Sequence, residues 1–123
     1  MKIFVFGNPL VKEDAVSYAV GNELRNLGFE VEFVNDPLSI VDQKHERIVI
    51  VDTVLGIDKV RCVTLDEITV RGKMFSLHGF DLSNALKLLE VLGLLDDVVV
   101  IGVPSNAEPQ EVVADVIAEI EKV

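Results

Sequence analysis

The sequence predicts a single α/β domain, a three-layer α/β/α sandwich on a mainly parallel, mixed five-stranded sheet. Short runs rich in Val and Ile alternate along the chain with stretches of helical spacing, which is the order of a sheet whose crossover helices cover its faces. The chain has 123 residues, of which 50% are hydrophobic, enough for one core of ordinary size. Because no repeat or linker divides it, residues 1–123 are expected to form one domain.

The first part of the chain predicts two strands with a helix between them. Residues 2–6 form a β-rich run that is followed by Gly-Asn-Pro, a sequence typical of a loop. Residues 14–28 carry apolar side chains at helical spacing and end on a glycine, as a C-capped helix does. Residues 30–35 alternate again, and Pro37 ends this second strand.

The remainder predicts three strands and two helices. Residues 48–51 form a continuous apolar run, typical of a strand that is buried on both faces. Residues 61–65 predict a short antiparallel edge strand, because the connection before them is too short for a helix. Residues 81–92 have helical spacing, 98–103 predict a central strand, and 112–120 predict a final amphipathic helix.

The charge of the chain argues against several classes of partner. Lys and Arg total 11 against 21 Asp and Glu, a net charge of −10 that repels nucleic acid and anionic membrane surfaces. The longest apolar runs, such as 98–103, fall short of the roughly 18 residues that a membrane-spanning helix needs. The apolar run after Lys2 is too short for a signal-peptide core. A cytoplasmic location is therefore expected.

Cys62 is the one cysteine of the chain, so an internal disulfide is not possible. It lies between apolar neighbours in the predicted edge strand, which favours a small buried side chain. The alternative, a nucleophile, requires a nearby base, and no recognisable sequence motif provides one.

Polar residues from three segments are predicted to meet at one edge of the sheet. In such sheets ligands bind beyond the carboxyl ends of the strands, where the strand order reverses. The loop after the first strand leads to Glu13-Asp14, the third strand ends directly in Asp52, and Ser76-Leu77-His78-Gly79 precedes the second predicted helix. His45 precedes the third strand, and at that opposite edge it is expected to be solvated.

Each of these residues also has a purely structural interpretation. Asp14 suits the N-terminus of a helix as a cap, and His78 is able to hydrogen-bond to a loop carbonyl. Asp52 follows four apolar residues, so its carboxylate enters a desolvated position that requires donors or a cation. Together, an imidazole and two carboxylates form an open three-ligand site for a divalent ion.

These segments resemble the nickel-hydrogenase maturation endopeptidases. The resemblance is carried by Gly7-Asn8-Pro9-Leu10 followed by Glu13-Asp14, by Asp52 after the third strand, and by Ser76-x-His78 before a helix. It implies a phosphorylase/hydrolase-like fold in which Asp14, Asp52 and His78 are both metal ligands and catalytic residues. It also implies a substrate-contacting loop surface that includes Asn8, Glu13 and Asp36.

The resemblance further implies an aspartic-type or metal-dependent endopeptidase whose partner is a hydrogenase large-subunit precursor. The enzyme would recognise nickel supplied by this substrate and remove a C-terminal peptide by Lewis-acid chemistry. Zinc or cadmium would be able to occupy the same site. These roles are expectations for this chain.

Two alternatives remain open. Asn35-Asp36-Pro37-Leu38 stands where the family has a glycine-rich loop, which favours a non-catalytic metal-binding maturation factor. A phosphorylation-dependent receiver domain would also place acidic residues at this edge. It requires the acidic pair directly at the strand end, however, and a lysine where this chain has Gly102-Val103-Pro104-Ser105.

Overall fold

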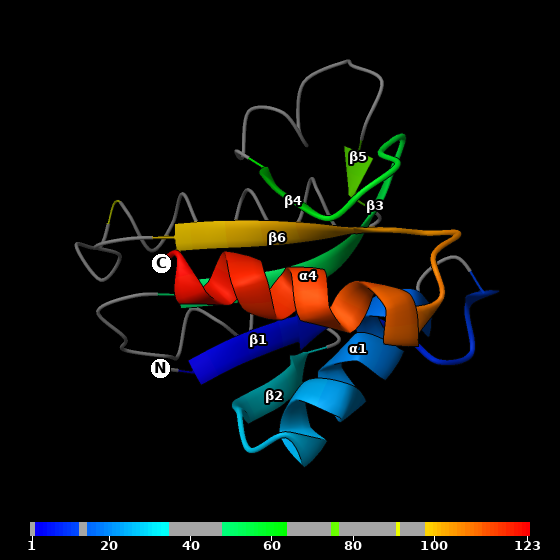
Figure 1. Ribbon diagram of the computed structural model, residues 1–123. Helices are drawn as coiled ribbons and strands as arrows, with labels where there is room; N and C mark the ends of the chain where they lie inside the picture. The colour runs from blue at the N-terminus through cyan, green and yellow to red at the C-terminus, as the bar shows by residue number, and fades with distance from the viewer. Residues whose placement is uncertain (1, 13–14, 35–47, 64–74, 77–90, 92–97) are drawn as a thin grey trace.

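The computed structural model describes residues 2–12, 15–34, 48–63, 75–76, 91 and 98–123. Among these residues a strand, a helix and a strand come first, four more strands follow, and a helix comes last (Figure 1). The elements are β1 (Lys2–Phe6), α1 (Ala15–Asn26), β2 (Glu30–Val34), β3 (Ile48–Leu55), β4 (Arg61–Val63), β5 (Phe75–Ser76), β6 (Val98–Pro104) and α4 (Pro109–Glu121).

The strands form a mixed, mainly parallel sheet in the order β2-β1-β3-β6-β4, and β5 pairs with β3 off this path. The β1–β2, β1–β3 and β3–β6 pairs are parallel, whereas β4 lies antiparallel to β6 at an edge. The predicted mixed five-stranded arrangement and its antiparallel edge strand are confirmed. The two-residue strand β5, which pairs antiparallel with the end of β3, was not predicted, because two residues carry no recognisable period.

Helices α1 and α4 pack against each other and cover one face of the sheet (Figure 1). The core beneath them contains residues from both helices and from the central strands, including Val5, Val20, Val51, Ile101 and Val116. Of the helix predicted at 81–92, which would supply the third layer, the described residues include Val91 alone, which is helical and exposed. Within the described ranges, no helix is long and apolar enough to cross a membrane.

The end of α1 confirms the predicted glycine cap. Gly28 has a φ of 98°, a left-handed conformation that glycine adopts without steric cost. The Gly28 N–H donates to the Arg25 carbonyl and the Phe29 N–H to the Leu24 carbonyl, both at 3.1 Å. This pair of hydrogen bonds is the Schellman motif. It ends the helix and turns the chain into β2.

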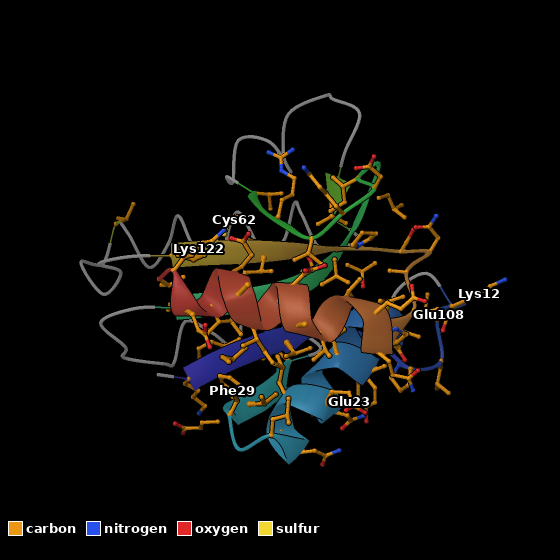
Figure 2. All side chains as sticks on the ribbon, viewed as in Figure 1. Lys12, Glu23, Phe29, Cys62, Glu108 and Lys122 are labelled. Atoms are coloured by element: carbon orange, nitrogen blue, oxygen red, sulfur yellow. The ribbon has the colours of Figure 1, made fainter. Side chains whose placement is uncertain are left out.

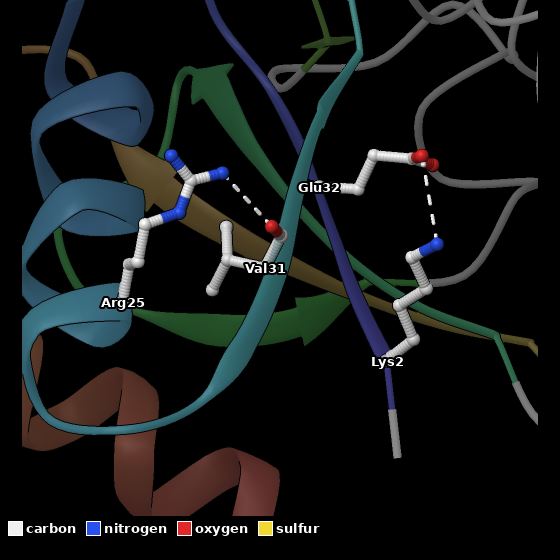
Figure 3. Close-up of polar contacts among 4 residues, drawn as sticks. All are labelled: Lys2, Arg25, Val31 and Glu32. Carbon is white, nitrogen blue, oxygen red and sulfur yellow. Dashed lines mark hydrogen bonds and ion pairs between the residues drawn. The ribbon is translucent and has the colours of Figure 1, made fainter.

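Two polar contacts hold β2 at the outer edge of the sheet (Figure 3). Arg25 of α1 donates from Nη2 to the Val31 carbonyl at 2.9 Å, and its guanidinium lies 4.6 Å from the centre of the Phe33 ring. Lys2 of β1 forms a 3.5 Å ion pair with Glu32. A solvent-accessible ion pair contributes at most about 1 kcal/mol, so the Lys2–Glu32 pair adds little to the attachment of β2 to β1.

Candidate functional site

The strand order reverses between β1 and β3. From β1 the chain passes through α1 to β2 on one side of β1, and β3 then lies on the other side. The carboxyl ends of two parallel strands that diverge in this way leave a crevice in which α/β proteins bind ligands. The predicted site edge therefore coincides with the switch point of the sheet.

Asp52 lies at this switch point and is completely buried, with 0% of its surface exposed. It pairs with Phe6, the last residue of β1, and on the other side with Gly102 of β6. The prediction that the third strand ends at Asp52 is wrong, because β3 continues to Leu55. The additional length arises because Thr53 and Val54 still pair with β6 after β1 has ended.

The pleat of β3 directs Asp52 away from α1. Thr53, the next residue, hydrogen-bonds to Ser17 of α1, and Val51 belongs to the core beneath the two helices. Side chains alternate between the two faces of a strand. Asp52 therefore faces the side of the sheet opposite α1 and α4.

A buried hydroxyl network joins α1 to both strands of the switch point. The Thr53 hydroxyl donates to Ser17 Oγ at 2.8 Å, and the Ser17 hydroxyl donates to the Phe6 carbonyl at 2.5 Å. The backbone N–H of Ser17 donates to Thr53 Oγ1 at 3.3 Å. This pair was not predicted from the sequence. Ser17 lies among the buried residues of α1, and a polar residue on the apolar face of a helix is a recognisable signal.

The loop after β1 is ordered by Asn8. Its side-chain Oδ1 accepts a hydrogen bond from the Leu10 N–H at 2.9 Å, and its carbonyl accepts one from the Val11 N–H at 3.1 Å. This Asx turn gives Asn8 a local structural role. It also presents Leu10 to solvent with 91% of its surface exposed.

The other predicted site residues lie outside the described residues; they are Glu13, Asp14, Asp36 and His78, together with His45. Asp52 is thus the member of the proposed ligand trio whose position is defined. Among the described residues, no group of three or more His, Cys, Asp or Glu side chains is able to hold a metal ion. Asp14 directly precedes α1, and His78 follows β5 by two residues.

Cys62 is exposed, and the prediction of a buried side chain is wrong. It lies in the three-residue edge strand β4, where one side of the strand has no described neighbour. Its Sγ donates a hydrogen bond to Glu119 Oε2 of α4 at 3.3 Å. Figure 2 shows Cys62 beside Lys122, near the end of that helix, and Lys122 pairs with Glu119 at 3.2 Å.

The environment of Cys62 makes it a poor nucleophile. Partial desolvation of the sulfur against α4, followed by the hydrogen bond and the negative charge of Glu119, raises the pKa of the thiol from 9.0 to about 11. The same hydrogen bond, with that of Lys122, lowers the pKa of the Glu119 carboxyl. A thiol with this pKa stays protonated at neutral pH, and the thiolate is the reactive form.

We therefore expect Cys62 to react with iodoacetamide at pH 8 about tenfold more slowly than an ordinary cysteine. A two-unit rise in pKa lowers the thiolate fraction about a hundredfold, and the greater nucleophilicity of the more basic thiolate recovers about half of this on a logarithmic scale. Glu119→Gln removes the negative charge and should accelerate the reaction, as measured by mass spectrometry. Glu121→Gln is the matched control on the same helix, and equal rates for Glu119→Gln and the native protein would contradict this account.

Comparisons with known proteins identify relatives of this fold. The HycI family model, described as hydrogenase maturation protease, matches residues 34–123. The [NiFe] hydrogenase maturation protease HybD from Thermococcus kodakarensis aligns over 99% of this chain and 97% of its own, with a TM-score of 0.71 and 23% identity.

Two further solved structures share the fold. The endopeptidase HycI from Escherichia coli has a TM-score of 0.63 and 13% identity, and a hydrogenase 3 maturation protease has 0.63 and 14%. Each of these two alignments covers 99% of this chain and 87% of the other. No curated protein sequence matches significantly.

Proposed function

The chain belongs to the hydrogenase maturation proteases, and from this premise we propose that it removes the C-terminal peptide of a hydrogenase large-subunit precursor after recognising nickel in that precursor. The observation that carries the proposal is the position of Asp52. A carboxylate that is 0% exposed lies at the point where the strand order reverses, and this is where sheets of this type bind ligands.

We propose that Asp14 and His78 join Asp52 in binding the ion. Ala15, which follows Asp14, begins α1, and the first turn of α1 is hydrogen-bonded to β1 and β3 through Ser17. This arrangement ties the start of α1 to the switch point, which supports the inclusion of Asp14.

The path of β5 supports the inclusion of His78. Leu55 pairs with Phe75 and Val54 with Ser76, so β5 runs antiparallel, from the end of β3 back toward Asp52. Two residues lead from Ser76 to His78, a span of at most about 7 Å. The same interval separates Val54 from Asp52, which supports the proposal that His78 and Asp52 share an ion.

The proposed ligands suit a metal ion that the substrate brings with it. A neutral imidazole and two ionised carboxylates occupy three positions and leave others for the groups by which the precursor holds its nickel. Zinc or cadmium is expected to occupy the same positions in the absence of the precursor. Bound there, nickel would act as a Lewis acid toward a nearby carbonyl. We therefore propose that the protease depends on the metal that its substrate supplies.

The substrate-contacting surface is proposed to include Asn8, Glu13 and Asp36. Asn8 holds the loop after β1 in a defined turn, and the exposed Leu10 at its tip offers an apolar contact to a bound chain. The net charge of −10 favours a precursor tail that carries basic residues. A cytoplasmic location remains part of this proposal.

The test is to incubate the protein with a nickel-loaded large-subunit precursor and follow the precursor mass. Loss of a C-terminal peptide is the expected result. Stable binding without cleavage would instead support the non-catalytic maturation factor, which the Asn35-Asp36-Pro37-Leu38 sequence favours. The phospho-receiver alternative is set aside, because the chain belongs to the maturation proteases.

A further inference from the structure

We propose that Ser17 and Thr53 are positioning residues that hold the first turn of α1 and strand β3 in the relative placement required for ion binding. The inference deepens the proposed function and rests on it. The two hydroxyls would keep Asp14, the proposed ligand before α1, aligned with Asp52, the proposed ligand before Thr53. Neither residue is proposed to touch the ion.

Each of the two hydroxyl groups donates a hydrogen bond. Thr53 donates to Ser17 Oγ and Ser17 donates to the Phe6 carbonyl, at 2.8 and 2.5 Å. Both residues are 0% exposed, so water cannot replace a lost partner without entering the core. The hydrogen bonds therefore connect β3, α1 and β1 beside the position where Phe6 of β1 pairs with Asp52 of β3.

Thr53 also caps α1 from a distant part of the sequence. The first four N–H groups of an α-helix have no partner within the helix. Ser17 is the third residue of α1, and its N–H finds its acceptor in Thr53 Oγ1 at 3.3 Å. The start of the helix is therefore anchored to Thr53, the residue that follows Asp52.

The position of this anchor gives it a functional consequence. Asp14 is covalently adjacent to the first residue of α1, and Asp52 is adjacent to Thr53. A shift of the helix start relative to β3 would change the distance between the two proposed carboxylate ligands. Groups that orient metal ligands without touching the metal typically change affinity by 10–100-fold when they are removed.

The experiment uses the whole chain and measures Cd²⁺ binding by calorimetry, with the visible spectrum of bound Co²⁺ as a second readout. Thr53→Val keeps the shape of the side chain and removes its hydroxyl. We expect it to weaken Cd²⁺ binding about tenfold or more and to alter the Co²⁺ spectrum. Thr53→Ser should restore both properties, and Ser17→Ala provides an independent test if Thr53→Val fails to fold.

A control separates positioning from stability. Val116→Ala truncates a buried side chain of α4 and should lower the thermal midpoint without changing Cd²⁺ affinity. Native affinity and spectrum in folded Thr53→Val or Ser17→Ala would overturn this inference while leaving the proposed function intact. A native protein that binds neither ion would overturn the proposed function and this inference together.

Discussion

Asp52→Asn is expected to weaken divalent-ion binding by more than about a hundredfold, exceeding the 10–100-fold losses typical of residues that only orient a ligand. The substitution keeps the size of a side chain that is 0% exposed, but it removes the negative charge and one strong oxygen donor. His78→Ala should have a comparable effect, because it removes the imidazole ligand. Calorimetric titration with Ni²⁺ or Cd²⁺ measures both effects, and loss of precursor cleavage should accompany them.

Matched controls make this prediction specific. Asp58→Asn removes the same charge from an exposed residue, and His45→Ala removes the other histidine of the chain. Both controls should retain native affinity. If Asp52→Asn or His78→Ala binds the ion as tightly as the native protein, the ligand assignment is wrong.

Gly21→Val is expected to lower the free energy of unfolding by about 3 kcal/mol, near the upper end of the usual cost of overpacking a core. A Cβ at Gly21 would lie 2.7 Å from Phe33 Cε1 and 3.0 Å from both Cγ atoms of Val5. Val5 is fully buried, and the Phe33 ring is confined by Tyr18 at 4.7 Å. Val5 has no solvent side to move toward, and the half-buried Phe33 ring would have to shift against Tyr18, so the added side chain would push α1 away from the sheet.

Asn22→Val is the control for this substitution. It places the same side chain one residue further along α1, at an exposed position, where substitutions usually change stability by no more than about 0.5 kcal/mol. Urea denaturation of the two variants and the native protein gives the comparison. A Gly21→Val variant as stable as Asn22→Val would contradict the close packing of α1 on β1 and β2.

Hydrophobic periodicity and turn residues were sufficient to predict most of the described fold. The apolar run at 48–51 indicated a strand buried on both faces, and β3 is buried along nearly its whole length. Gly28 marked the end of α1, because its left-handed φ of 98° is a conformation that other residues rarely adopt. The short connection before 61–65 correctly predicted an antiparallel edge strand.

The errors arose where tertiary contacts overrode a local pattern. Asp52 was predicted to end its strand, but pairing with β6 and β5 carries β3 three residues further. Cys62 was predicted to be buried from its apolar neighbours, yet the edge position of β4 leaves it exposed.

The candidate site was only partly accessible from sequence. Topology correctly placed Asp52 at the switch point, because the carboxyl ends of parallel strands share one edge. The Ser17–Thr53 contact joins residues 36 positions apart, and no spacing rule predicts such a pair. Asp14 and His78 lie outside the described residues, so their convergence on Asp52 stays a prediction.

Anomalous diffraction from crystals soaked in Zn²⁺ or Cd²⁺ tests the central claim most directly. We predict a single strong peak at the switch point of the sheet, bound by Asp14, Asp52 and His78, with zinc–ligand distances of about 2.0–2.2 Å. The peak should be absent from Asp52→Asn crystals soaked in the same way. An ion held by other residues, or an Asp52 carboxylate that makes no contact with it, would contradict the assignment of this edge as the metal-recognition site.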